Sequence, residues 1–175
     1  KNCSPIIYSN FENYKCSRYY SHFGKYLFNS DYAILSLSEL NRNKFKYYGQ
    51  FGQEAVIFVR PDSSEKTFPA QLVDIIDFDS FYGQNVGQKH ELVIVSSPKK
   101  IVGEWRVICS NNKIIDYSLY KYQDQISKIR AIPPEILKFV EELLKIDYKP
   151  DDVFCFDICS DFNYDYKMLE LTSFS

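Results

Sequence analysis

Short apolar runs separated by polar turns dominate the chain from residue 55 onward, and this pattern predicts a sheet-rich fold. We expect strands at 55–60, 70–78, 91–97, 103–110 and 113–120. The last two runs are joined by the turn sequence NNK, which is typical of a hairpin. Residues 1–50, by contrast, show only a weak helical pattern, at 36–40.

One clear helix is predicted at 133–146, PPEILKFVEELLKI. Two prolines stand at its start, Glu135 lies in its first turn, and apolar residues recur at helical spacing. Two further apolar runs flank a polar turn within residues 153–175, which predicts a terminal hairpin. Together these elements predict an α+β fold with mostly antiparallel strands and few helices.

Composition narrows the class of protein. The chain has 175 residues, of which 45% are hydrophobic, enough for a folded domain with a sizeable core. The net charge is -2, and the basic residues are scattered among the acidic ones, so no basic stripe indicates binding of nucleic acid. No apolar run is long enough to span a membrane.

Five cysteines without a C-x-x-C pair are typical of buried thiols in a reducing compartment, so we expect a cytoplasmic protein. Because Met168 is the one methionine, we also expect that sequence is missing before residue 1.

Each apolar run of the terminal hairpin carries one acidic residue, Asp157 in the first and Glu170 in the second. If the hairpin turns about Asn163 and Tyr164, antiparallel pairing places Asp157 directly opposite Glu170. The same register places Met168 and Thr172 on the face of Glu170, and it predicts the apolar cross-strand pairs Phe156–Leu171 and Ile158–Leu169.

Two ionised carboxylates at cross-strand distance, about 4.5 to 5.5 Å between Cβ atoms, repel each other unless something offsets the repulsion. One acid could be protonated, an Arg or Lys could bridge the two, or a divalent cation could bind both. Mg²⁺ prefers such carboxylates together with substrate phosphates. The alternative, of about equal weight, is a solvated polar face that carries two acids without a ligand.

Charged residues upstream favour a ligand. Arg60 ends a predicted strand and Lys66 follows in a polar loop, an arrangement that suits a polyphosphate. In GEWRV, Glu104 and Arg106 share a face while Trp105 points to the other. A carboxylate can accept hydrogen bonds from a ribose, and an arginine can stabilise a phosphoryl group. Each charge alone is more often a surface residue, but their occurrence together favours a nucleotide.

The ordered motifs resemble those of the ATP-grasp superfamily, and more narrowly a divergent clade of it, the R-2-K type, related to the cell-division-cycle translation-initiation assembly factor. The matching segments are FVRPDSSEKTF, VIVSSPKKIVGEWRVICSNNKIIDYSLY and DVFCFDICSDFNYDYKMLELTSFS. The resemblance implies an ATP-grasp domain at 51–175, preceded by a partial N-terminal segment at 1–50.

The resemblance also implies two small α+β lobes with mostly antiparallel sheets that clasp ATP and Mg²⁺. Residues 95–97 are expected at the adenine, Glu104 at the ribose, and Arg106 at the transferred phosphoryl group. The implied cofactor-binding residues are Arg60, Lys66, Val95, Ser96, Ser97, Glu104 and Arg106, and the implied catalytic residues are Arg106 and Lys66. The implied metal ligands are Asp157, Glu170 and Thr172.

The implied reaction is an ATP- and Mg²⁺-dependent ligation, in which a carboxylate is activated as an acyl phosphate and then attacked by an amine. A protein or peptide is among the candidate substrates. Two departures from the family pattern argue against turnover: Thr172 replaces the usual Asn, and Pro69 and Ala70 replace residues of a glycine-bearing loop. An ATP-binding assembly module without ligase turnover, and an ordinary α+β binding domain, therefore stay open as alternatives.

Overall fold

The protein is an α+β structure whose residues fall into two compact units. The computed structural model describes residues 10–63, 65–163 and 165–174. Unit 1 comprises Lys1–Tyr14, Arg18–Phe28 and Lys100–Ser175, and unit 2 comprises Lys15–Ser17 and Asn29–Lys99. The expected division at residue 50, into an N-terminal segment and an ATP-grasp domain, stays a prediction. None of the helices in the described residues is long and apolar enough to cross a membrane.

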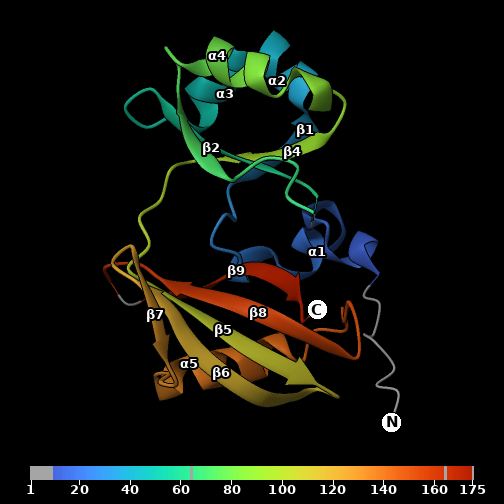
Figure 1. Cartoon of the computed structure of the whole chain (residues 1–175), viewed down its shortest axis with the longest axis vertical. Helices are drawn as coiled ribbons and strands as arrows, with labels where there is room; N and C mark the ends of the chain where they lie inside the picture. The colour runs from blue at the N-terminus through green and yellow to red at the C-terminus, as the bar shows by residue number, and fades with distance from the viewer. Residues whose placement is uncertain (1–9, 64, 164, 175) are drawn as a thin grey trace. The chain divides into compact units, whose positions relative to one another are not determined.

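Unit 1 is built on a five-stranded antiparallel sheet with the strand order β7-β6-β5-β8-β9 (Figure 1). Its strands are β5 (Gly103–Ser110), β6 (Lys113–Tyr122), β7 (Gln125–Ile129), β8 (Val153–Ser160) and β9 (Tyr166–Ser173). Asn111 and Asn112 have φ angles of 49° and 59°, the left-handed backbone that a two-residue hairpin turn requires. The hairpin predicted from NNK is therefore confirmed.

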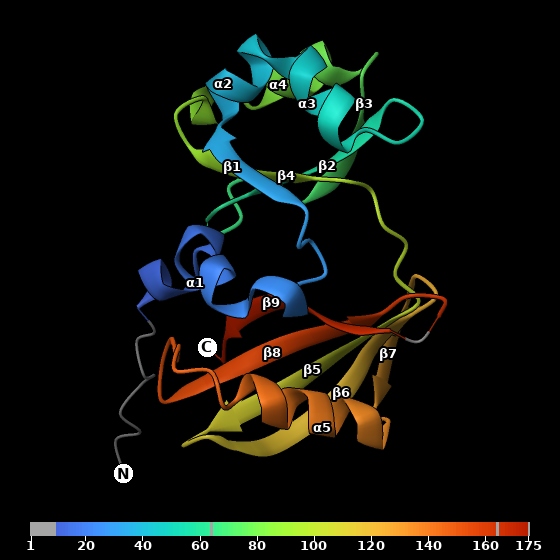
Figure 2. The same cartoon turned by 180° about the vertical axis from the view of Figure 1, so that it is seen from behind.

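Helices lie against one face of this sheet. The helices in this part of the structure are η1 (Phe11–Tyr14), α1 (Cys16–Phe23), η2 (Gly24–Tyr26) and α5 (Pro134–Leu143). Figure 2 shows α5 in front of the sheet. The ring of Phe23 contacts Phe156 of β8 at 5.8 Å, and Tyr26 contacts Phe139 of α5 at 6.0 Å, both measured between ring centroids. Because these contacts join α1, η2 and α5, the three helices cover the face of the sheet that carries Phe156.

Unit 2 is built on a four-stranded antiparallel sheet with the strand order β1-β4-β2-β3. Its strands are β1 (Tyr32–Ser36), β2 (Val56–Pro61), β3 (Gln71–Asp74) and β4 (Leu92–Ser96). Its helices are α2 (Leu37–Arg42), α3 (Lys44–Phe51), α4 (Phe78–Gln84) and η3 (Val86–Gln88). Helix α2 begins where Ser36 caps it by accepting a hydrogen bond from the Glu39 N–H at 3.1 Å, which confirms the weak helix predicted at 36–40.

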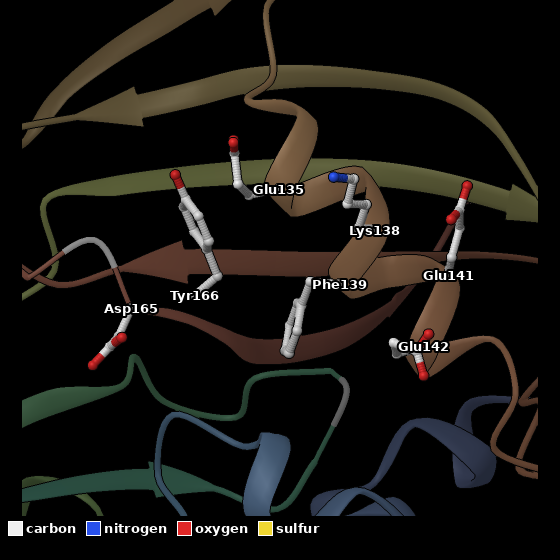
Figure 3. A pocket seen from close by; sticks show the side chains of 7 residues that line it. All are labelled: Glu135, Lys138, Phe139, Glu141, Glu142, Asp165 and Tyr166. Atoms are coloured by element: carbon white, nitrogen blue, oxygen red, sulfur yellow. The ribbon is translucent and has the colours of Figure 1, made fainter.

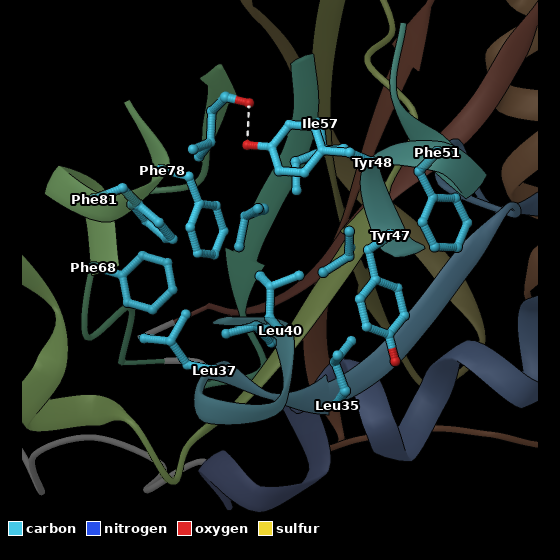
Figure 4. Close-up of a cluster of buried hydrophobic side chains, with 14 residues drawn as sticks. Leu35, Leu37, Leu40, Tyr47, Tyr48, Phe51, Ile57, Phe68, Phe78 and Phe81 are labelled. Atoms are coloured by element: carbon cyan, nitrogen blue, oxygen red, sulfur yellow. Dashed lines mark hydrogen bonds between the residues drawn. The ribbon is translucent and has the colours of Figure 1, made fainter. Parts of the chain in front are cut away.

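The core of unit 2 is rich in aromatic rings (Figure 4). Phe78 is fully buried, with ring centroids 6.0 Å from Tyr48 and 5.9 Å from Phe81. The Tyr48 hydroxyl donates to the Val73 carbonyl oxygen at 3.0 Å, so its polar end is satisfied inside the core. The buried cluster consists of Leu35, Leu37, Leu40, Tyr47, Tyr48, Phe51, Ile57, Val59, Phe68, Val73, Phe78, Phe81, Val93 and Val95.

The strand predicted at 70–78 is wrong after Asp74, where β3 ends and a turn leads into α4. The Asp74 carboxylate accepts a hydrogen bond from the Ile76 N–H at 3.0 Å, and the Asp74 carbonyl accepts from the Asp77 N–H at 3.1 Å. The first bond forms an Asx turn and the second closes a β-turn, and both compete with continued strand pairing. The run IIDF thus resembles a strand by composition but folds as a turn and the start of a helix.

The α+β class with two antiparallel sheets is confirmed, but the sequence did not locate α1, α3 and α4. Helix α1, with the sequence CSRYYSHF, buries Tyr19, Tyr20 and Phe23. Tyrosine carries a polar group, so the apolar stripe of this helix is hard to see in the sequence. The helix predicted at 133–146 is confirmed as α5, with shorter bounds.

Replacing Phe78 by Ala removes a fully buried ring from the unit 2 core, and we expect it to lower the free energy of unfolding by about 3 to 5 kcal/mol. The matched control is Phe45→Ala on α3, because the Phe45 side chain is 72% exposed and its loss changes stability by about 0.5 kcal/mol or less. Urea denaturation of the two variants checks the difference. Equal losses would contradict this description of the core.

Candidate functional site

Charged side chains line the face of the unit 1 sheet opposite the one that carries Phe156. Arg106 of β5 is directly opposite Asp157 of β8, and Asp157 is in turn opposite Glu170 of β9. Glu104 lies two residues before Arg106 on the same face. The prediction that Asp157 faces Glu170 is confirmed, as is the pairing of Phe156 with Leu171.

Arg106 and Asp157 form a bidentate ion pair. Arg106 Nε donates to Asp157 Oδ1 and Arg106 Nη2 donates to Asp157 Oδ2, each at 2.8 Å. The Asp157 side chain is 3% exposed and that of Arg106 is 45% exposed. The hydrogen bonds to Asp157 raise the pKa of Arg106 and outweigh the opposing effect of burial. An arginine is therefore paired with one of the two acids, Asp157, and offsets its charge beside Glu170.

A β-bulge interrupts the β8–β9 pairing directly beside this row. Ile158 pairs with Met168, whereas Asp157 pairs with Glu170, so Leu169 is the extra residue. The predicted pair of Ile158 with Leu169 is therefore wrong, and Met168 is fully buried on the apolar face instead of sharing the face of Glu170. The predicted turn centre at Asn163 and Tyr164 lies partly outside the described residues, since Tyr164 is not among them.

Glu104 is 8% exposed and is held by two residues of β6. The Tyr120 hydroxyl donates to Glu104 Oε2 at 2.5 Å, and Lys121 Nζ lies 3.3 Å from Glu104 Oε1. Burial, followed by the negative charges of Asp157 and Glu104, raises the pKa of Tyr120, so its hydroxyl stays protonated. The sequence did not reveal Tyr120 as part of this face, because two irregularities in the β5–β6 pairing shift the register away from the turn.

The side chains at the predicted metal position fit a hard cation. Asp157, Glu170 and Thr172 offer only oxygen donors, which Mg²⁺ prefers. Both Asp157 oxygens accept from Arg106, but each carboxylate oxygen has a second lone pair. The described residues contain no group of three or more His, Cys, Asp or Glu side chains that could hold a metal, so the third protein ligand of this set is a hydroxyl, that of Thr172.

The Thr172 hydroxyl oxygen is buried and makes no hydrogen bond of normal geometry within the described structure. Thr172 faces Cys155 across the strand pair, and a thiol is only a weak hydrogen-bonding group. A buried hydroxyl without a strong partner is uncommon in folded proteins, and the Thr172 oxygen keeps its lone pairs for one.

Unit 2 places two of the predicted nucleotide-binding side chains on one face of its sheet. Arg60 pairs with Ile94 and Ser96 pairs with Phe58, so Arg60 and Ser96 both point away from the aromatic core. Arg60 is 7% exposed, and Ser96 is fully buried without a hydrogen bond from its hydroxyl in the described structure. Val95 belongs to the core cluster, so its side chain is not available to a ligand.

The predicted adenine segment ends in a polar cluster. The Ser97 N–H donates to Asp31 Oδ2 at 3.2 Å, and the Ser97 hydroxyl and Lys99 Nζ donate to the same carboxylate. The backbone donor of Ser97 is thus already engaged. Although burial alone would raise the pKa of Asp31, the hydrogen bonds from Lys99 and Ser97 outweigh it and lower this pKa.

Lys66 lies in an exposed loop at a φ angle of 50°, and its N–H donates to the Ser63 carbonyl at 3.3 Å. Asp62, at the start of the same loop, accepts from the Ser17 N–H at 2.7 Å and from the Ser17 hydroxyl at 2.5 Å. Asp62, which belongs to the matching segment FVRPDSSEKTF, therefore has a structural role that the sequence did not indicate.

A separate shallow hollow of about 520 Å³ lies beside α5 and the start of β9 (Figure 3). Phe139 and Tyr166 line it together with Glu135, Lys138, Glu141, Glu142 and Asp165. None of these residues belongs to the row of Arg106, Asp157 and Glu170, so the hollow is distinct from the candidate site.

We expect Arg106→Ala to lower the free energy of unfolding by about 2 to 3 kcal/mol, because the buried Asp157 carboxylate loses two charged hydrogen bonds. The estimate lies below the range for fully buried pairs, since Arg106 is half exposed and water can replace part of the interaction. Adding Asp157→Asn should recover part of the loss, because the remaining amide is neutral. Urea denaturation of the wild type, both single variants and the double variant checks this coupling, and additive losses would contradict it.

The lowered pKa of Asp31 predicts an acid-sensitive contribution to stability. Asp31 contributes fully above its unfolded pKa near 3.8, and the contribution is lost as the pH falls through the lower folded value. The difference in melting temperature between wild type and Asp31→Asn should therefore be constant above about pH 5 and shrink below about pH 4. Thermal melts across the acidic range up to neutral pH measure it, and a difference that grows on acidification would show the opposite linkage.

Solved structures with a similar fold show which architecture the chain adopts. The chain is similar to the ATP-grasp ligase PsnB in complex with the precursor peptide PsnA2 and AMPPNP, with 13% identity, a TM-score of 0.58, and 92% of this chain and 49% of that one covered. It is similar to a RimK domain ATP-grasp protein from Sphaerobacter thermophilus, with 10% identity, a TM-score of 0.66, and coverage of 90% and 57%. It is also similar to the macrocyclase MdnC of Microcystis aeruginosa bound to the precursor peptide MdnA, with 14% identity, a TM-score of 0.57, and coverage of 96% and 54%.

The chain thus spans about half the length of these structures, and at such identities the likeness shows the fold alone. No curated protein matches the sequence. The family comparison is decisive: residues 38–163 match the model of the ATP-grasp domain, R-2-K clade, family 2. Because this match covers well over half of the 175 residues, the chain belongs to the R-2-K clade of the ATP-grasp superfamily.

Proposed function

We propose that the chain binds ATP with Mg²⁺ and uses it to ligate a carboxylate to an amine through an acyl phosphate. The observation that carries the proposal is the row of Arg106, Asp157 and Glu170 across three strands of the unit 1 sheet, with Glu104 on the same face. Family membership supports assigning this row to the metal and the phosphoryl group. We also propose that the protein is cytoplasmic and that it binds neither nucleic acid nor a membrane.

Arg106 is suited to a phosphoryl group because its pair with Asp157 uses two of its five N–H donors and fixes the plane of the guanidinium. The half-exposed side chain keeps further donors for a phosphoryl oxygen. A guanidinium held in place in advance costs little reorganisation when charge develops on that oxygen. Arg106 is accordingly the proposed catalytic residue of unit 1.

The metal ligands in this proposal are Asp157, Glu170 and Thr172. When bound there, Mg²⁺ neutralises phosphate charge and orients the phosphate oxygens. Arg60 and Lys66 are the proposed phosphate-binding residues, and Val95, Ser96 and Ser97 form the segment proposed to lie near the base. Lys66 is also the second proposed catalytic residue.

The proposed substrate class is based on two of the similar solved structures. PsnB and MdnC are both described in complex with precursor peptides, which favours a peptide or protein as the carboxylate or amine substrate here. PsnB is also described with a minimal precursor, Mg and ADP, which supports Mg²⁺ as the metal.

The alternative is an ATP-binding assembly module that does not turn over. It is favoured by Thr172, whose hydroxyl is a weaker metal ligand than the amide oxygen usual in the family, and by the glycine-poor loop that carries Pro69 and Ala70. In this alternative, the nucleotide stabilises the fold without being consumed.

We expect ATP with Mg²⁺ to raise the melting temperature of the wild type, since a ligand at about 100 times its Kd stabilises the native state by about 2.7 kcal/mol. Lys66→Ala should weaken ATP binding about tenfold, because a charged hydrogen bond to phosphate is lost. Lys89→Ala is the control: Lys89 is likewise an exposed lysine of unit 2, and the proposal gives it no role. A thermal melt with and without nucleotide measures the shift in melting temperature. Isothermal titration calorimetry measures the ATP affinities of the two variants, and equal affinities would contradict the assignment of Lys66.

ADP release separates the two functions on the same samples. The ligase requires ADP release that depends on both a carboxylate and an amine, and that is lost in Arg106→Ala. Binding without release across a panel of peptides would instead support the assembly module.

A further inference from the structure

Tyr120 contacts both of the charged residues that β5 contributes to the polar face. Its hydroxyl donates to Glu104 Oε2 at 2.5 Å. Its ring lies under the Arg106 guanidinium, whose central carbon is 5.5 Å from the ring centroid. One side chain thus holds two functional groups, one by a hydrogen bond and the other by a cation–π contact.

The position of Tyr120 arises from an irregularity in the sheet. Glu104 pairs with Lys121 and Trp105 pairs with Leu119, so Tyr120 is the extra residue on β6. An extra residue of this kind is a β-bulge, which changes the direction in which a side chain points. Bulges are enriched beside functional sites. Gly103, at the start of β5, lets the chain pass the Trp105 ring, since a Cβ atom there would lie 2.5 Å from that ring.

The hydrogen bonds on Glu104 leave room for a ligand. Tyr120 uses one lone pair of Oε2, and Lys121 interacts with Oε1. An ionised carboxylate has about four lone-pair sites, so Glu104 can still accept hydrogen bonds from two vicinal hydroxyl groups. The carboxylate is thus held in orientation and still has about two acceptor sites.

We propose that Tyr120 is a positioning residue that orients the Glu104 carboxylate toward the ribose hydroxyls and supports the Arg106 guanidinium beneath the terminal phosphate. This inference deepens the proposed function and rests on it. Tyr120 touches neither ribose nor phosphate in this account; it acts through Glu104 and Arg106. Its two contacts make separate predictions, one for the sugar and one for the γ-phosphate.

The sugar prediction uses Tyr120→Phe, which removes the hydroxyl and keeps the ring. We expect this change to weaken the binding of ATP with Mg²⁺ about five- to tenfold, because Glu104 loses the hydrogen bond that orients it. Binding of 2′,3′-dideoxy-ATP should change by less than about twofold, since that nucleotide lacks the hydroxyls that Glu104 would bind. Tyr122→Phe on the same strand is the control, because Tyr122 is 42% exposed and should alter neither affinity.

The phosphate prediction uses Tyr120→Leu, which also removes the ring under Arg106. We expect the ratio of ATP to ADP affinity to fall in Tyr120→Leu and to stay at the wild-type value in Tyr120→Phe. Melting temperatures without nucleotide check that each variant is folded. If Tyr120→Leu does not fold, the comparison of ATP with dideoxy-ATP in Tyr120→Phe decides the proposal alone.

The outcomes separate this inference from the function on which it rests. The inference is supported if the wild-type protein binds ATP and if Tyr120→Phe lowers the affinity for ATP more than the affinity for dideoxy-ATP. Equal weakening of both nucleotides would indicate a merely structural tyrosine and overturn it, as would no weakening of either. Wild-type protein that binds no ATP would overturn the proposed function together with this inference.

Discussion

The candidate site depends on one ion pair, the bidentate contact of Arg106 with Asp157 in the middle of the unit 1 sheet. It makes a nearly buried carboxylate tolerable beside Glu170, and it fixes the plane of a guanidinium that still reaches solvent. Charged groups of this kind are rarely buried unless they are paired. The pair therefore explains how an otherwise apolar ribbon can carry two acids in its interior.

The neighbours of this pair form a connected polar network over three strands, β6, β5 and β8. Tyr120 and Lys121 of β6 hold Glu104 of β5, Tyr120 underlies Arg106, and Arg106 holds Asp157 of β8. Glu170 and Thr172 of β9 complete the face. Side chains that fix one another in this way are organised before a ligand arrives, and such preorganisation is what phosphoryl transfer requires of a protein.

The sequence was most informative where strands alternate regularly. The cross-strand pair of Asp157 with Glu170, the shared face of Glu104 and Arg106, and the Asn-rich hairpin all follow from a period of two and a turn position. It failed where the register shifts: the bulge beside Asp157 moved Met168 to the apolar face, and the irregular β5–β6 pairing concealed Tyr120. Bulges depend on local backbone geometry, which periodicity does not encode. Helices α3 and α4 of unit 2 were missed for a different reason, since their buried positions are tyrosine and phenylalanine within polar segments.

A crystal structure with a non-hydrolysable ATP analogue and Mn²⁺ in place of Mg²⁺ tests the candidate site directly. We expect an anomalous Mn²⁺ peak bonded to carboxylate oxygens of Asp157 and Glu170, with the terminal phosphate within hydrogen-bond distance of the Arg106 guanidinium. Bound nucleotide without a cation at these two acids, or with its phosphates away from Arg106, would rule out the proposed site.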